Sequence, residues 1–349
     1  MQTTDMFRKI RSLFYGVADL AQDTGFSIER ICAAISYSLD PLIPTGADCA
    51  LIDFPNYANV GDSAIWLGQR EYLKQRQASV KYTCDFDSYN RQQMAKSIDE
   101  EAVILLQGGG NLGDLYPWHQ NLRENVIQDF PNNRIIVLPQ SIHFRSADAL
   151  AQAKRVFEGH KAMTLMVREK QTLQQVETDF NVSTVHCPDM AFFLGAINTK
   201  SKPLAALSCL LRTDAEKRES YLPETSTKVL ADDWTLDGSD FCAVNAEQNA
   251  DEQNNRLSSF DQAATQRLER GCKMLAQGRV VVTDRLHGHI LCVLMGIPHY
   301  VMDNSYGKIR AVYETWTKES RLVHWSESRR EAIEKALALA DTPTIRKRR

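Results

Sequence analysis

The chain of 349 residues carries 41 basic and 44 acidic side chains, which gives a formal net charge of −3. This balance provides no overall attraction for nucleic acid or for an anionic membrane surface, so any recognition of phosphate must be local. The length favours two domains, and 43% apolar with 24% charged residues is the composition of an ordinary globular protein.

The N-terminal part of the chain predicts helices only. Apolar residues recur at helical spacing over residues 6–40, and Asp40-Pro41 ends the second of two predicted helices. We therefore treat residues 1–45 as an N-terminal helical extension.

From residue 50 onward, short apolar runs alternate with stretches of helical period. Strands that alternate with helices indicate parallel βαβ units, so the sequence predicts an α/β fold. The predicted strands are residues 50–54, 102–106, 134–138, 165–167, 207–211, 280–282 and 299–302. The predicted helices are residues 62–75, 115–130, 147–158, 169–178, 260–277, 286–295 and 327–340.

A polar stretch with a proline, residues 195–205, separates two strand-helix series. We place a domain boundary there, with Rossmann-like parallel-sheet domains over 46–198 and 199–349 and a terminal helix in the second. Open parallel sheets bind ligands outside the carboxyl ends of their strands, so the cleft between two facing domains is the expected site.

Several features bear on cellular location. The longest mainly apolar run, Ile290–Ile297, is far shorter than the roughly 20 residues of a membrane span. No unbroken apolar secretory segment follows the first basic residues, and eight widely spaced cysteines predict free thiols, so we expect a cytoplasmic protein. Residues 245–255 predict a mobile polar excursion, and residues 346–349 form a basic tail.

Two loops of the first domain are candidates for the acceptor side of a site. The turn after the first strand holds Asn59 and Asp62, more polar groups than a helix cap needs. Residues 107–114 contain a formal G-x-G-x-x-G, but Asp129, at the spacing of the acidic partner of a dinucleotide site, falls within a predicted helix. We interpret 107–114 as a substrate-facing loop at a helix N-terminus; its candidates are Gly109, Gly110, Asn111 and Asp114.

Two further strand ends carry residues suited to catalysis or anion binding. His143 lies beside Gln140 and Ser141, although a single histidine is more often packed or solvated. Arg168 and Glu169 end the next strand, where they form either a surface ion pair of little consequence or a site in which the guanidinium binds a carboxylate or phosphate.

The most informative cluster is Thr283–His289, which opens an apolar helix after a strand. Cations such as Arg285 and His287 are disfavoured at the positive end of a helix dipole, and a bound anion would resolve that conflict. Lys308 follows at the same sheet edge as a phosphate partner. The histidines have no acidic partners at metal-ligand spacing, so we expect no metal and no cofactor.

In combination, these segments resemble the polysaccharide pyruvyl transferase family over about residues 50–315. The segments that carry the resemblance are Asn59-Val60-Gly61-Asp62, Gly108–Asp114, Pro139–Phe144, Arg168-Glu169, Leu211–Asp214 and Thr283–Gly288.

The resemblance implies a fold like that of the GT-B glycosyltransferases and transfer of a pyruvyl group from phosphoenolpyruvate, without metal, to a sugar of an exopolysaccharide or its lipid-linked precursor. It implies donor binding in the second domain by Arg285 and Leu286, with Arg168 from the first, and catalysis by His287, with His143 as a further candidate. Lys308, from its place at the sheet edge, is the further donor-binding candidate.

Two other functions remain open from the residues alone. One is a glycosyltransferase of the same architecture that uses a nucleotide sugar. The other is a non-catalytic sugar-binding protein of an assembly complex, which would leave the pairing of Arg285 with His287 unexplained. With a lipid-linked acceptor, the amphipathic start and the basic tail would serve peripheral contact with the inner face of the membrane. The acceptor sugar and the oligomeric state are not predicted.

Overall fold

The computed structural model describes residues 26–198, 201–214, 216–221, 224, 226, 228–235, 253–305 and 307–346. The first predicted helix, residues 245–252 of the predicted excursion and most of the basic tail lie outside these residues. The last three residues of that excursion, 253–255, are placed at the start of a helix instead.

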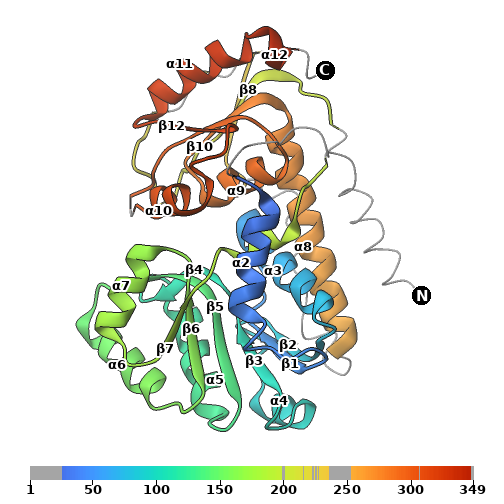
Figure 1. Cartoon of the computed structure of the whole chain (residues 1–349), viewed down its shortest axis with the longest axis vertical. Coiled ribbons are helices and arrows are strands. Elements are labelled where there is room, and N and C mark those ends of the chain that lie inside the picture. Colours follow the sequence, from blue (N-terminus) through green and yellow to red (C-terminus); the bar gives the residue numbers. More distant parts are fainter. Residues whose placement is uncertain are drawn as a thin grey trace.

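The described residues form two parallel sheets in separate lobes (Figure 1). The first sheet has seven strands in the order β2-β1-β3-β5-β6-β7, with β4 paired to β5 outside that order, and the second has five in the order β12-β11-β10-β8-β9. The first contains β1 (Asp48–Ile52), β2 (Ser79–Cys84), β3 (Val103–Leu106), β4 (Gly109–Gly113), β5 (Arg134–His143), β6 (Met163–Val167) and β7 (Ser183–His186). The second contains β8 (Ala205–Leu210), β9 (Val229–Asp232), β10 (Gly278–Thr283), β11 (His299–Val301) and β12 (Val323–Trp325). This confirms the predicted α/β fold with two parallel-sheet domains.

The helices predicted from residue 62 onward are confirmed within a few residues, apart from an earlier start of the helix predicted at 260. In chain order the helices are α2 (Ile28–Leu39), α3 (Val60–Gln75), α4 (Arg91–Ser97), α5 (Pro117–Asp129), α6 (Ala147–Glu158), α7 (Lys170–Asp179), the 3₁₀ segment η1 (Met190–Leu194), α8 (Gln253–Ala276), α9 (Leu286–Leu294), α10 (Lys308–Val312), the π segment η3 (Tyr313–Thr317), α11 (Arg329–Ala340) and α12 (Pro343–Arg346).

The segment 108–114 differs from its prediction. It forms β4, paired in parallel with β5, rather than a loop that opens a helix, and α5 begins only at Pro117. Glycine allows this pairing because Gly113 has φ +125° and approaches the carbonyl of His143 so closely that a side chain would not fit.

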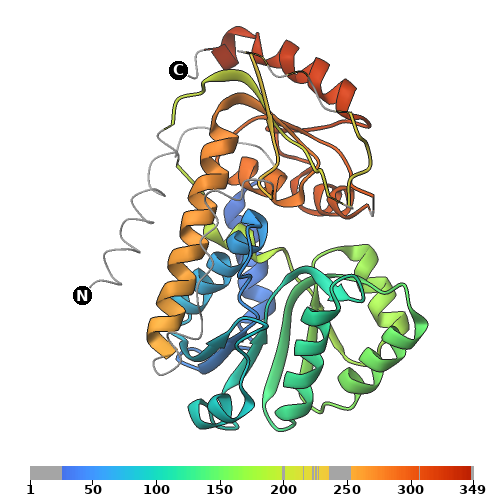
Figure 2. The ribbon, with the colours of Figure 1, turned by 180° about the vertical axis from the view of Figure 1, so that it is seen from behind.

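Helix α8 runs along both lobes, as Figures 1 and 2 show from opposite sides. It packs on α3 and β2 of the first half and on β8 and β10 of the second. The predicted boundary between residues 198 and 199 stays a prediction. The contacts of α8 show that one helix packs against both halves of the molecule.

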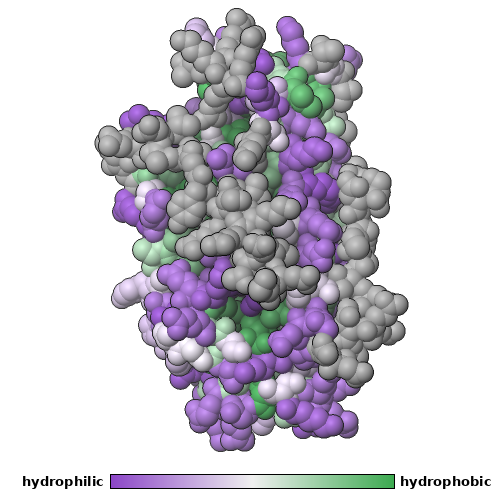
Figure 3. Space-filling model, turned by 90° about the vertical axis from the view of Figure 1, so that its right-hand side faces the viewer, coloured by the Kyte–Doolittle hydropathy of each residue, from purple (hydrophilic) through white to green (hydrophobic). Residues whose placement is uncertain are grey.

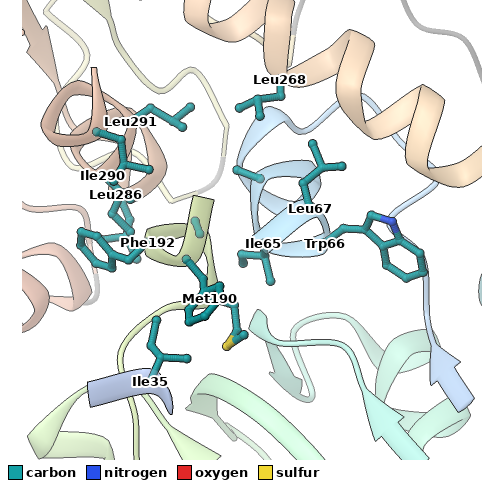
Figure 4. Packing of buried hydrophobic residues seen from close by; sticks show 14 of the residues in the cluster. Ile35, Ile65, Trp66, Leu67, Met190, Phe192, Leu268, Leu286, Ile290 and Leu291 are labelled. Atoms are coloured by element: carbon teal, nitrogen blue, oxygen red, sulfur yellow. The ribbon is translucent and has the colours of Figure 1, made fainter. Parts of the chain in front are cut away.

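One hydrophobic cluster continues from the first half into the second (Figure 4). Ile65 of α3, Met190 and Phe192 of η1, and Leu286 and Ile290 of α9 belong to it and are almost fully buried. Because burial of such side chains contributes about 1.5–3 kcal/mol each, this core fixes the start of α9 against α3 and η1.

The described surface and helices bear on whether the chain meets the requirements of a membrane span. On the face in Figure 3, the coloured side chains are mainly hydrophilic, with apolar ones in small separate patches. None of the described helices combines the length and the apolar character that crossing a bilayer requires. The cysteines at 32, 49, 84, 187, 209, 272 and 292 are free thiols.

Candidate functional site

A cavity of about 580 Å³ lies between the two halves of the molecule, lined by residues of both. It is formed by loops at the carboxyl ends of strands, as expected for facing open sheets. The ionisable residues that line it include Asp62, Asp87, His119, Arg168, Arg212, Asp214, Glu216, Arg285, His287 and Lys308.

Arg168 is held rigidly in the wall of this cavity. It follows β6 and is 1% exposed; its Nε donates to Ser141 Oγ at 2.8 Å and to Glu169 Oε1 at 3.0 Å, while Nη1 donates to Asp189 Oδ2 at 2.6 Å. Burial alone would lower the pKa of the guanidinium, but Glu169 and Asp189 outweigh it and raise that pKa. Arg168 is therefore a buried, oriented cation, and the surface ion pair can be set aside.

Two cations from different halves converge at Gly110. The position that a Cβ would take on Gly110 is 3.1 Å from Arg168 Nη2 and 3.7 Å from Lys308 Nζ. Lys308 begins α10 in the second half, whereas Arg168 belongs to the first. The bare glycine thus leaves the two donors side by side on the cavity wall.

Asp189 links the two halves and was not predicted from the sequence. It follows β7 and is 1% exposed; its Oδ2 accepts from Arg168 Nη1 and lies 3.3 Å from His287 Nε2. Burial would raise the pKa of the Asp189 carboxyl, but His287 and Arg168 outweigh it and hold that pKa well below its usual value. Asp189 is thus an anion that orients an arginine of one half and a histidine of the other.

His287 is enclosed on its other side by α3. A Cβ added to Gly61 would overlap the imidazole, at 2.6 Å from Cγ and closer still to Nδ1. The side chain of His287 is 11% exposed. Gly61 therefore makes room for the ring, which lies between the first turn of α3 and Asp189.

Arg285 lies at the N-cap of α9, but its charge is met by the protein itself. Nε and Nη2 donate to the two carboxylate oxygens of Asp233, both at 2.7 Å, and Nη2 also donates to Asp214 Oδ2 at 3.1 Å. From the sequence, we expected a bound anionic ligand to balance the charge of Arg285. Asp233, which follows β9, supplies that counter-charge instead, and Arg285 still lines the cavity.

A second set of charges in the C-terminal half surrounds Glu216. Lys308 Nζ donates to Glu216 Oε2 at 2.6 Å, and Arg212 Nη2 lies 3.0 Å from the same oxygen. Arg212 also donates to both oxygens of Asp214. Burial lowers the pKa of Lys308 despite the opposing effect of Glu216. Arg212 is a further cavity cation that the sequence interpretation had not placed in the site.

The structure brings most of the predicted site residues together. The cavity is lined by Asn59, Asp62, Gly110, Asn111, Arg168, Arg285, Leu286, His287 and Lys308. Asn59 Nδ2 donates to Asp62 Oδ2 at 2.7 Å, and Tyr57 donates to the same oxygen, so these polar groups form a compact cluster at the start of α3.

Three predicted residues lie elsewhere. Gly109 lies next to Asp62: the position that a Cβ would take on Gly109 is 3.5 Å from Asp62 Oδ1. Asp114 accepts the backbone N–H groups of Arg145 and Ser146 at 2.8 and 2.7 Å, so it holds the start of α6. His143 ends β5 beside Gly113, and none of the three belongs to the cavity lining.

The described residues contain no group of three or more histidine, cysteine or acidic side chains arranged to hold a metal ion. The expectation of a reaction without metal or cofactor stays a prediction.

Comparison with known proteins decides the family. The model of the family described as polysaccharide pyruvyl transferase matches residues 59–306. The chain belongs to the polysaccharide pyruvyl transferase family. The prediction that it is a pyruvyl transferase is confirmed at this level, and the matched region includes the cavity residues from Asn59 to His287.

Individual relatives agree with this family. The chain is 36% identical to "Pyruvyl transferase 1" of Schizosaccharomyces pombe over 287 residues, 76% of this chain and 69% of the relative. It is 29% identical to a Bacillus subtilis protein provisionally named pyruvyl transferase EpsO, over 84% of this chain and 92% of the relative. A crystal structure of an uncharacterized Klebsiella pneumoniae protein shares the fold, with a TM-score of 0.57 at 19% identity over 88% of this chain and 100% of that one.

Proposed function

We propose that this pyruvyl transferase takes its pyruvyl group from phosphoenolpyruvate and joins it as a ketal to two hydroxyls of a sugar in an exopolysaccharide or its lipid-linked repeat unit. The observation that carries this proposal is the convergence of Arg168 and Lys308 at Gly110, beside His287. Phosphoenolpyruvate is small and carries a carboxylate and a phosphate, so it needs a few oriented cations in a protein that is not basic overall.

The surrounding carboxylates support this interpretation because they orient the cations. Asp189 and Glu169 hold two of the guanidinium nitrogens of Arg168, which leaves Nη2 at the cavity wall by Gly110. Asp233 holds Arg285 in the same manner. Guanidinium groups fixed before the donor arrives lose little freedom on binding it, which is the usual benefit of a preorganised site.

The reaction requires two proton gains, at C3 of the donor and at the departing phosphate, and two proton losses, one from each sugar hydroxyl. His287 delivers a proton to C3 of the donor, which leaves an oxocarbenium centre at C2. The first sugar hydroxyl adds to C2 and loses its proton; the C2–O bond to phosphate then breaks, and phosphate departs with the bonding electron pair. The second hydroxyl adds to C2 and loses its proton, so the products are the cyclic ketal and inorganic phosphate.

Asp189 and Arg168 give His287 a setting suited to this role. A protonated imidazole is stabilised by the buried carboxylate 3.3 Å from Nε2, and the same carboxylate is fixed by Arg168. Donor binding by Arg168 is therefore coupled through Asp189 Oδ2 to the orientation of the acid. His143 does not line the cavity, so it has no part in this scheme.

The test is release of phosphate from phosphoenolpyruvate by the purified full chain, with a panel of synthetic hexosides and lipid-linked sugars as acceptors. We expect acceptor-dependent release, and a loss of about a hundredfold or more in turnover for His287→Ala with an unchanged melting temperature. Calorimetric titration with phosphoenolpyruvate and with nucleotide diphosphates separates this donor from a nucleotide sugar. Tight binding of the nucleotide alone would overturn the proposal.

We also propose that the enzyme works in the cytoplasm, where phosphoenolpyruvate is formed, and meets lipid-linked acceptors at the inner face of the membrane. Flotation of the full chain with vesicles of anionic and of neutral lipid tests the contact with the membrane. Recovery of all protein in the unbound fraction with both kinds of vesicle would refute that contact and leave the chemistry unaffected.

A further inference from the structure

A second histidine lines the cavity on the wall formed by the first half. His119, the third residue of α5, is 4% exposed, and its Nδ1 lies 2.8 Å from both carboxylate oxygens of Asp53. A carboxylate only accepts hydrogen bonds, so Nδ1 carries a proton, and in the neutral imidazole Nε2 is then the acceptor. Among the described residues, Nε2 has no hydrogen-bond partner. The ring therefore presents an unpaired acceptor to the cavity.

The backbone of Asp53 is held in an uncommon conformation that positions its carboxylate. Asp53 directly follows β1 with φ +76° and is 2% exposed, and its N–H and that of Phe54 both donate to Cys84 O at 2.9 Å. Aspartate tolerates the left-handed region better than most residues, yet such outliers persist mainly where the surroundings impose them and are frequent at functional sites.

A buried guanidinium and two aromatic rings surround the pair formed by Asp53 and His119. Arg123, which is 1% exposed, places Nη2 3.7 Å from Asp53 Oδ2, and Asn111 fixes the same guanidinium. The aromatic rings of Tyr57 and Phe86 lie edge-on to the imidazole at 5.9 and 5.6 Å. Asp53, the nearby Arg123 and the two rings therefore hold the imidazole of His119 in one orientation.

Formation of a ketal releases two hydroxyl protons. His287 can recover one of them after it has protonated C3, which leaves the other hydroxyl proton without an assigned acceptor. Asp62 also lines the cavity, but its Oδ2 already accepts from Tyr57 and Asn59. His119 has the free lone pair, and it lies beside Trp118, which lines the cavity and is 48% exposed, an arrangement suited to a sugar ring.

We propose that His119 is the general base that takes the proton of an acceptor hydroxyl, and that Asp53 is the residue that positions it. This inference rests on the proposed function. As the sugar oxygen bonds to C2 of the donor, Nε2 takes the hydroxyl proton. Asp53 stabilises the resulting imidazolium, which then passes the proton to the departing phosphate or to water.

The test compares four forms of the full chain: wild type, His119→Ala, Asp53→Asn and the control His160→Asn, whose histidine lies outside the cavity and bonds Phe130 O. Asparagine suits the left-handed conformation at position 53, so that variant should fold. Its amide would donate to Nδ1 and place the proton on Nε2, where it blocks base catalysis.

We expect both cavity variants to lose about a hundredfold or more in kcat for phosphate release with phosphoenolpyruvate and the hexoside panel. The dissociation constant for phosphoenolpyruvate should stay within about twofold of the wild-type value, and the melting temperature within a few degrees. The control His160→Asn should keep the wild-type kcat. Added imidazole should restore part of the turnover of His119→Ala, because the cavity left by the ring can admit the missing base.

The outcomes separate this inference from the function on which it rests. An active wild type with a His119→Ala variant of normal kcat, or one whose acceptor KM alone rises, would overturn the base and leave pyruvyl transfer from phosphoenolpyruvate intact. A kcat loss without rescue, together with weakened donor binding, would assign His119 a structural role and also overturn the base. A wild type that releases no phosphate with any acceptor would overturn both proposals.

Discussion

Replacement of Gly61 by alanine should displace His287 without changing any ionisable group. The added Cβ would stand 2.6 Å from His287 Cγ, against about 3.4 Å for ordinary contact, so the ring must retreat by about an ångström. A misplacement of that size at a catalytic group costs about a hundredfold in rate. The backbone should tolerate the change, because Gly61 is the second residue of α3 and alanine has a better helix propensity by up to about 1 kcal/mol.

The assay is phosphate release from phosphoenolpyruvate together with thermal unfolding of the same preparation. We expect turnover to fall about a hundredfold while the melting temperature is maintained. Gly68→Ala, in the same helix, is the matched contrast: its Cβ would meet the backbone of Met190, 2.7 Å from the carbonyl carbon, which cannot move cheaply. That variant should lose stability. A Gly61→Ala enzyme with turnover within a few-fold of the wild type would refute the importance of the His287 position.

Further variants test the charges around the cavity and in the core. Asp189→Asn should lower turnover about tenfold to a hundredfold in the phosphate-release assay, since the amide no longer stabilises a protonated His287. Lys308→Met should weaken binding of phosphoenolpyruvate about tenfold by calorimetry, because one charge-assisted bond is lost. His289 and His299 bond each other at 2.7 Å in the core; burial lowers the pKa of His289 well below its usual value and that of His299 to about 4. Unfolding therefore takes up protons once the pH falls below about 6.5. The free energy of unfolding should fall by up to about 1.4 kcal/mol per pH unit for each histidine between pH 6.5 and 5. Urea titrations across this pH range measure the dependence, which should be flatter for His299→Gln.

The strands that the sequence did not reveal share a place in the fold. Four of them, β2, β7, β9 and β12, are the edge strands of the two sheets. Their burial is partial, as in β7, where no residue is fully buried, whereas every residue of β3 is buried. Prediction from apolar runs therefore finds the interior of a parallel sheet and overlooks its edges. The fifth, β4, was overlooked because glycines hid its strand character.

The same oversight explains why the sequence interpretation lacked the two aspartates that position the cations of the site. Asp189 lies three residues beyond the end of β7 and Asp233 directly follows β9, so both lie at the carboxyl ends of unpredicted strands. Arg168 and His287, in contrast, follow strands with clear apolar runs and were identified. The available signal was an aspartate just after a short run with β-branched residues, as in Ser183–His186.

His119 escaped prediction for a different reason. It lies inside a predicted helix, where a histidine carries no strand-end signal, and Asp53 was counted within a strand. Only the three-dimensional structure brings the two side chains to 2.8 Å.

The two overlooked aspartates also change how the site is understood. In a cluster of cations alone, the side chains would repel one another, and the cluster would attract any small anion without distinguishing among them. Here Asp189 accepts one hydrogen bond from Arg168, whose Nε is also held by Glu169, and Asp233 accepts two from Arg285. Because these carboxylates neutralise much of the cationic charge, selectivity comes from the few donor atoms left at the cavity wall rather than from net charge. Asp189 also lies 3.3 Å from His287 Nε2, so one carboxylate of the first half orients both Arg168 of that half and His287 of the other.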